Sequence, residues 1–293
     1  MDILLQLVAN GVVRGALIAL LAVGFGLVFR SMSLFHIAYA GIYVVASYLG
    51  LLFIGLLGLP ALVGLAFAAI GACIAGYLIE RLVYRPLFLR DAPPLMVFVA
   101  SLGTYIILEN LMALVFGNET RMLATTQEPT VSLGPVAVTR IMVIQLLLGI
   151  VLCSVFLLVL RKVRVFKVLW VMADEPALVT ALGLPFMRLR ALVLVCSSLF
   201  AAAASLCSSW DTGVQPGVGM GAFLSATVAV LIGGSRRYAG WLVGALVLGM
   251  VQSLTQWWFS ARWVELVTFS LLVTVLLLRP DGLLGLRLRA EEK

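Results

Sequence analysis

The sequence predicts an all-α protein, a polytopic transmembrane helical bundle, and three observations support this fold class. First, 63% of the 293 residues are hydrophobic and only 11% are charged, whereas soluble domains are about half apolar and about one quarter charged. Second, the apolar residues form long runs with short polar segments between them. Third, basic residues gather in alternate connecting segments. This composition excludes a soluble globular protein and a disordered chain.

The apolar runs set the expected number of membrane crossings. A helix needs ~20 apolar residues to cross a bilayer. The run at 221–234 is too short to cross upright, so a re-entrant half-helix is expected there, within a bundle of roughly eight to nine spans. The start, Met1-Asp2-Ile3, has no basic region or cleavage site and predicts an uncleaved first helix. The runs occupy residues 3–29, 33–57, 59–79, 94–117, 141–160, 189–209, 221–234, 239–259 and 264–278.

The positions of the basic residues predict the orientation of the bundle. Sixteen of the twenty, all except Arg14, Arg121, Arg140 and Arg262, lie in alternate connections or at the C-terminal end. Segments rich in Lys and Arg face the cytoplasm, so the N-terminus is expected outside and the C-terminus inside. The net charge of +7 is therefore interpreted as a topology signal rather than a nucleic-acid-binding patch.

The longest cytoplasmic connection, at about 161–188, contains a short helix with capping signals. Asp174 and Glu175 precede Pro176, and Gly183 follows the last turn, which is typical of a capped helix. A helix this short is unstable alone in water. It is expected either to dock on a cytoplasmic partner, the favoured interpretation, or to lie on its own bundle. Its apolar face consists of Ala177, Leu178, Ala181 and Leu182.

The sequence contains no catalytic or nucleotide-binding motif. There is no G-x-x-x-x-G-K-[ST], H-E-x-x-H or G-x-S-x-G pattern, and His36 is the sole histidine. A P-loop or a multi-histidine metal site is therefore excluded. The four cysteines are expected to be small buried hydrophobes. We expect a protein that is not an enzyme and has no cofactor or metal of its own, which leaves transport, channel formation or scaffolding.

Polar groups at membrane depth are costly and usually functional. His36 opens the second run, Glu109-Asn110 lies deep in the fourth, and a Gly/Pro-rich stretch at 212–221 follows the sixth. Each feature also has a structural interpretation. His36 could be an interfacial histidine, Glu109-Asn110 could form a satisfied interhelical hydrogen bond, and the Gly/Pro-rich stretch could be an outer surface loop. Arg14 is expected either to extend towards water or to pair with Glu109.

Several motifs resemble one family across nearly the whole chain. They are Glu80-Arg81-Leu82-Val83-Tyr84-Arg85-Pro86-Leu87, Ala100-Ser101-Leu102-Gly103-Thr104, Leu108-Glu109-Asn110, Ala173–Gly183, Ala222-Phe223 with Gly233-Gly234, Gly240 and Gly244, and Arg279-Pro280-Asp281-Gly282-Leu283-Leu284-Gly285. In this order they resemble the LivH-type permease subunits of branched-chain amino acid ABC importers, a family that also includes urea and amide importers. The first motif resembles a cytoplasmic loop of the family, and 173–183 resembles its ATPase-docking loop.

Three departures from the family pattern bear on the substrate. The family's N-F-A-H-G is His36-Ile37-Ala38-Tyr39-Ala40 here, the segment 216–223 is shorter, and Arg236-Arg237 replaces a Gly-Ser pair. The first two changes fall in segments expected to face the pathway. They leave open a related solute, such as urea, an amide or a small carboxylate.

The resemblance implies that residues 1–293 form a single transmembrane permease domain in a bacterial inner membrane. It implies a homologous second permease subunit, two cytoplasmic ATPase subunits that bind ATP and Mg²⁺, and a periplasmic or extracellular substrate-binding protein. The docking residues are then Asp174, Glu175, Ala177, Leu178, Ala181, Leu182 and Gly183. The expected pathway residues are His36, Tyr39, Tyr43, Thr104, Glu109, Asn110, Gly213, Pro216 and Gly219.

Two other functions remain as alternatives. An ion-coupled secondary transporter would use the embedded Arg14, His36 and Glu109, although such groups are few. A membrane scaffold would have no pathway, and would tolerate substitution of His36, Tyr39 and Glu109.

Overall fold

The computed structural model of the chain is a helical bundle and confirms the predicted fold class. It describes residues 2–123, 130–133, 136–163, 166, 168–169, 185–235, 237–279 and 281–284. Within these residues, eight helices are long and apolar enough to cross a membrane, and one shorter apolar helix covers Val218–Gly233. The expectation of about eight to nine spans with a half-helix near 221–234 agrees with this arrangement.

The helices follow the apolar runs closely. Proline, glycine and polar residues in the connections end each run, because they cannot continue a buried helix. The elements are α1 (Asp2–Met32), α2 (Ala38–Gly50), the π-helical turn η1 (Leu51–Leu56), α3 (Ala61–Ile79), the π-helical turn η2 (Glu80–Tyr84), α4 (Arg85–Leu89), α5 (Pro94–Phe116), β1 (Thr130–Leu133), β2 (Val136–Thr139), α6 (Arg140–Lys162), α9 (Phe186–Thr212), α10 (Val218–Gly233), α11 (Tyr238–Trp258), the short 3₁₀ turn η3 (Ala261–Trp263) and α12 (Val264–Leu278).

Three local features differ from the sequence-based expectation. The second helix begins at Ala38 rather than at residue 33, because Ser33 has a φ of 51° and the chain turns there. The segment that begins at Glu80, expected as a loop, is helical, since η2 and α4 continue α3 to Leu89. An antiparallel hairpin pairs β1 with β2, and the apolar runs gave no signal for it.

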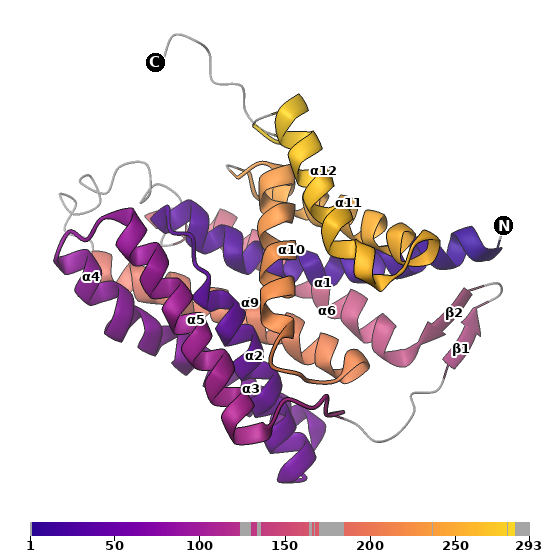
Figure 1. The fold of residues 1–293 in the computed structure, drawn as a ribbon, viewed down its shortest axis with the longest axis horizontal. Coiled ribbons are helices and arrows are strands. Elements are labelled where there is room, and N and C mark those ends of the chain that lie inside the picture. Colours follow the sequence, from indigo (N-terminus) through magenta and orange to yellow (C-terminus); the bar gives the residue numbers. More distant parts are fainter. Residues whose placement is uncertain are drawn as a thin grey trace.

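Helix α1 is the central element of the bundle. Figure 1 shows it along the long axis, with α2, α3 and α5 on one side and α11 and α12 on the other. Small residues let neighbouring backbones approach it. A Cβ added to Gly15 would lie 3.1 Å from Cα of Leu246, and one added to Gly26 would lie 2.8 Å from the ring of Trp241. Packing of this kind drives helix association where lipid removes the hydrophobic contribution.

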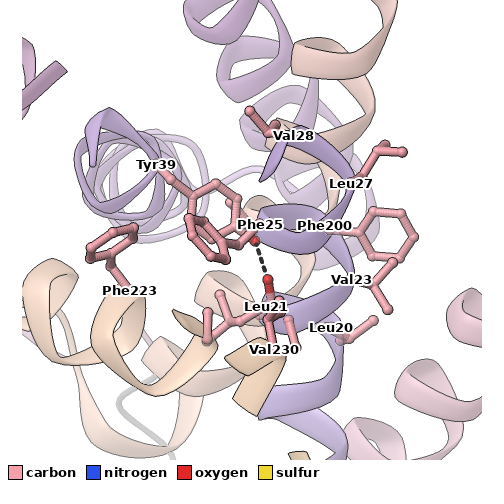
Figure 2. Packing of buried hydrophobic residues seen from close by; sticks show 14 of the residues in the cluster. Leu20, Leu21, Val23, Phe25, Leu27, Val28, Tyr39, Phe200, Phe223 and Val230 are labelled. Carbon is pink, nitrogen blue, oxygen red and sulfur yellow. Dashed lines mark hydrogen bonds between the residues drawn. The ribbon is translucent and has the colours of Figure 1, made fainter. Parts of the chain in front are cut away.

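The largest buried cluster lies where α1, α2, α9 and α10 meet. Figure 2 shows Phe25 of α1 beside Phe223 of α10, and their ring centroids are 5.4 Å apart in an edge-to-face arrangement. Tyr39 points from α2 towards α1 and donates its hydroxyl to the carbonyl of Leu21 at 3.1 Å. This bond satisfies the one polar atom of the side chain inside an apolar cluster. The cluster fixes the helices that surround the polar sites.

The glycine contact between α10 and α11 generates a stability prediction. A Cβ at Gly244 would lie 2.8 Å from the backbone nitrogen of Gly233 and closer still to the carbonyl oxygen of Ala229. Gly244→Ala is therefore expected to lower the free energy of unfolding by about 1–3 kcal/mol, the usual cost of overpacking. Thermal unfolding of the detergent-solubilised chain measures this change.

Gly103→Ala on α5 is the matched control. Nothing lies within 4 Å of a Cβ added there, and alanine favours the helix by about 1 kcal/mol over glycine. Equal melting temperatures for the two alanine variants would contradict the proposed role of Gly244.

Candidate functional site

A polar cavity lies between α5 and the chain segment that leads into α10. Its volume is about 470 Å³, and its lining includes Glu109, Asn110 and Pro216, three of the predicted pathway residues. Ala113, Asn118, Gln215 and Gly217 complete the lining. We call this cavity the α5–α10 pocket. The structure therefore brings two separate sequence signals, the polar pair in α5 and the Gly/Pro-rich stretch, to the same place.

The carboxylate of Glu109 faces the N-terminal end of α10. Gly217 precedes the first residue of α10, and a Cβ added to it would lie 4.0 Å from Oε1 of Glu109. The N-terminus of a helix carries a partial positive charge and free N–H groups, which complement an acidic side chain. Asn110 is exposed and donates its amide to the carbonyl of Ile106 at 2.8 Å. The pocket thus presents an anionic group beside backbone N–H donors.

The segment between α9 and α10 is held in a defined non-helical shape. Gly213 ends α9 with a φ of 81°, a conformation that glycine adopts without strain. Val214 exchanges two backbone hydrogen bonds with Arg121, at 2.8 and 3.0 Å. The Thr120 hydroxyl donates to Oε1 of Gln215 at 3.2 Å. These bonds satisfy backbone that leaves the helix, as required for irregular backbone near a membrane.

Four other predicted pathway residues pack within the bundle away from the lining of this pocket. Tyr39 and Tyr43 are buried in α2, and Thr104 is half-buried in α5, where its hydroxyl donates to the carbonyl of Ala100 at 2.8 Å. Gly219 packs on α2, where a Cβ would lie 2.7 Å from a methyl group of Val44. None of these four residues lines the α5–α10 pocket.

His36 lies between α1 and α2, fully buried, at the opposite end of α5 from Glu109. Its Nδ1 is 2.6 Å from the hydroxyl of Tyr84, which donates to Oγ of Ser101 at 2.8 Å. Ser101 also accepts the backbone N–H of Ala38 at 3.0 Å. The Tyr84 hydroxyl thus lies between the imidazole of His36 and the hydroxyl of Ser101. Burial lowers the pKa of His36 to about 3, so the imidazole is neutral at physiological pH.

A buried ion pair lies next to this network. Nε of Arg190 in α9 donates to Oε1 of Glu80 in η2 at 2.8 Å, and their side chains are 8% and 3% exposed. The guanidinium also lies 4.5 Å from the ring centroid of Phe88 in α4. Arg190 thus makes both a charge-assisted hydrogen bond and a cation–π contact. Both contacts join the extension of α3 to α9.

Sequence reasoning missed part of both sites. Gln215 lies within the Gly/Pro-rich stretch but was not singled out, and Asn118 follows the glycine that ends α5; its position after a C-cap was the available signal. The partnership of Tyr84 with Ser101 and that of Glu80 with Arg190 had no signal in sequence spacing. The predicted docking residues Asp174, Glu175, Ala177, Leu178, Ala181, Leu182 and Gly183 lie outside the described residues. In the described part of the chain, no cluster of three or more His, Cys, Asp or Glu side chains is arranged to hold a metal ion.

The fold and the site together define a class of protein. The chain is a multi-pass membrane protein whose helices leave a polar pocket beside an irregular segment, and its sequence has no catalytic or nucleotide-binding motif. These are the features of a membrane transport subunit.

Comparison with known proteins identifies the family. Residues 7–276 match the family model described as "Branched-chain amino acid transport system / permease component". The chain belongs to this family, whose members are non-catalytic transmembrane subunits of ABC transporters. The resemblance inferred from the sequence motifs is therefore confirmed.

Individual relatives cover nearly the whole chain. The permease protein BraD of Pseudomonas aeruginosa, described as part of a high-affinity branched-chain amino acid transport system, is 28% identical over 295 residues, which cover 96% of this chain and 95% of the relative. The LivH permease of Escherichia coli K12 is 26% identical with the same coverage. Among solved structures, a chain of "PsaBC from Streptococcus pneumoniae in complex with Fab" matches with a TM-score of 0.55 and 16% identity, covering 95% of this chain and 92% of that one. That match supports the fold alone.

The neutral buried imidazole of His36 generates a pH prediction. The folded-state pKa of about 3 lies below the ordinary value near 6.5, so the unfolded chain binds an extra proton between these values. This contribution to stability is fully present above pH 6.5 and is lost as the pH falls towards 3. At pH 5 the expected loss is about 2 kcal/mol.

Thermal unfolding of the wild type and of His36→Asn at pH 7.5 and pH 5 measures this contribution. Asparagine keeps a hydrogen-bonding group near Nδ1 but does not titrate, so its melting temperature is expected to fall less between the two pH values. Parallel losses in the two proteins would contradict the assignment.

Proposed function

We propose that this chain is the permease subunit of an ABC importer that takes up branched-chain amino acids, and that the α5–α10 pocket is part of its substrate pathway. The observation that carries the pathway assignment is the polar cavity that joins Glu109 of α5 to the N-terminal end of α10. The family membership and the names of the relatives BraD and LivH support the substrate class.

The pocket has the chemistry that an α-amino acid requires. The carboxylate of Glu109 attracts an ammonium group, and the free N–H groups at the start of α10 attract a carboxylate. Asn110, Asn118 and Gln215 add neutral hydrogen-bonding groups around the same cavity. An importer that receives its substrate from a binding protein needs only weak contacts with the substrate in the pathway. The few polar groups in this lining suit that role.

The buried predicted residues contribute by positioning the helices of the pathway. Tyr39 holds α2 to α1 through Leu21, and Gly219 lets the first turn of α10 approach α2. Tyr43, Thr104, Gly213 and the His36 network belong to the same helices and connections. We infer that these residues set the distance between α5 and α10, and hence the width of the pathway.

The proposed complex contains a homologous second permease subunit, two ATPases that bind ATP and Mg²⁺, and an extracytoplasmic binding protein. The distribution of basic residues supports a cytoplasmic C-terminus and an external N-terminus. In this orientation the α5–α10 pocket lies towards the outer end, where the binding protein delivers substrate. Residues 174–183 lie on the cytoplasmic side and dock on an ATPase.

Replacement of Glu109 tests the pathway. Glu109→Gln keeps the size of the side chain and removes its charge, so the initial rate of leucine uptake by the reconstituted complex is expected to fall about tenfold, the effect of losing one charge-assisted contact. Glu119→Gln, at an exposed position outside the pocket, is the control and should transport normally. Leucine uptake by Glu109→Gln at the wild-type rate would exclude Glu109 from the pathway. Uptake by the isolated wild-type chain without ATPases would instead favour an ion-coupled transporter.

Charges on the helix predicted at 174–183 test the coupling role. Ala177→Glu and Leu182→Glu, made separately, each place a carboxylate on its apolar face, and co-purification of the ATPase subunits should be lost. Met122→Glu adds the same charge at an exposed position at the other end of the bundle and should retain the ATPases. Normal ATPase recovery with both docking variants would exclude this helix as the contact.

A further inference from the structure

A second polar cavity lies at the end of the bundle where α9 and α11 finish. Its volume is about 410 Å³, within the ~300–1,000 Å³ typical of small-molecule sites. It lies among α1, α6, α9 and α11 and shares no lining residue with the α5–α10 pocket. We call it the α1–α11 pocket. Its lining combines two opposite charges with apolar side chains.

Arg14 supplies the positive charge. It lies about 18 Å along α1 from Asp2, at 1.5 Å per residue, one turn after Asn10, which lines the same cavity. Its Nη1 donates to Oε1 of Gln256 in α11 at 2.8 Å. A guanidinium has five N–H donors, and this is the single hydrogen bond found for it among the described residues. The remaining donors are available to a ligand in the cavity.

Asp211 supplies the negative charge from the last turn of α9. It lines the same cavity as Arg14. In the described part of the chain no ion pair joins these two side chains; the ion pair found there is that of Glu80 with Arg190. Asp211 is exposed towards water and has no hydrogen-bond partner in the described part of the chain. Two opposite charges that face one cavity without touching leave room for a ligand between them.

The rest of the lining is mixed: it includes polar side chains such as Asn10, Ser208 and Ser253, and an apolar part that can hold an aliphatic side chain. Leu7, Leu17 and Trp257 present apolar surface to the cavity. Gln145 uses its amide to donate to the carbonyl of Cys207 at 2.9 Å and so helps to fix the wall formed by α6 and α9.

We propose that the α1–α11 pocket binds a free α-amino acid as a zwitterion. Its carboxylate lies against Arg14, its ammonium group against Asp211, and its side chain against the apolar wall. This site goes beyond the proposed pathway, since it requires neither Glu109 nor α10, and it explains a charged residue that the pathway does not use.

Equilibrium binding of radiolabelled L-leucine to the full chain in nanodiscs, without binding protein or ATPases, tests the proposal. Arg14→Gln and Asp211→Asn are each expected to weaken binding about tenfold or more. N-acetyl-leucine, which lacks the ammonium group, and leucinamide, which lacks the carboxylate, should compete poorly. Arg262→Gln removes an exposed arginine outside the cavity and should bind as the wild type does.

Several outcomes would overturn the site. One is wild-type affinity for leucine in Asp211→Asn, a variant at an exposed position that should fold normally. Another is competition by N-acetyl-leucine equal to that by leucine. A third is leucine binding that is lost in Glu109→Gln but kept in Arg14→Gln. A co-purified phospholipid that is lost in Arg14→Gln, with no leucine binding by the wild type, would assign the pocket to lipid instead. Because the assay involves no transport, a failure of the proposed pathway is measured separately by uptake.

Discussion

Close contact between helix backbones is the constraint on which the rest of this structure depends. In a bilayer the hydrophobic effect does not drive one apolar helix against another, so packing must come from van der Waals contact at short range. Glycines at the crossings of α1, α10 and α11 permit this contact: a Cβ at Gly249 would overlap the backbone of Gly15, and one at Gly233 would overlap Gly240. These crossings place α1 at the centre and bring α10 into the bundle.

The polar sites lie where this close packing ends. The α5–α10 pocket opens beside the irregular segment that follows Gly213, and the α1–α11 pocket opens where α9 and α11 finish. In the middle of the bundle, Tyr39 has to satisfy its hydroxyl on the backbone of Leu21, because no water reaches it. Both pockets thus open where neighbouring helices end, although Arg14 and Glu109 reach them from within their own helices.

Much of the fold could be predicted from sequence, but the partnerships within it could not. The run 94–117 predicts α5 within one residue, because Pro94 and Gly117 bound an apolar helix. Glu109 and the Gly/Pro-rich stretch were each found as polar or broken segments in apolar surroundings. Their meeting in one pocket depends on how α5 and α10 pack, which local patterns do not encode. For the same reason the sequence did not indicate the hydrogen bond between Ser101 and Tyr84, although both residues lie in motifs singled out from the sequence.

The pair of Glu80 and Arg190 shows why a sequence motif expected as a loop is a helix. A loop would leave the carboxylate in water, where an exposed pair contributes little. Here α3 continues through the turn η2, and the carboxylate is buried against α9. A buried pair adds little net stability compared with apolar packing, but removing one partner is costly, so the pair favours one arrangement of the helices over others.

Phe88 of α4 stacks on Phe186, the first residue of α9, with ring centroids 5.3 Å apart, and Arg190 covers the ring of Phe88. The first turns of α9 are therefore fixed against α4 directly after the segment predicted to dock on an ATPase.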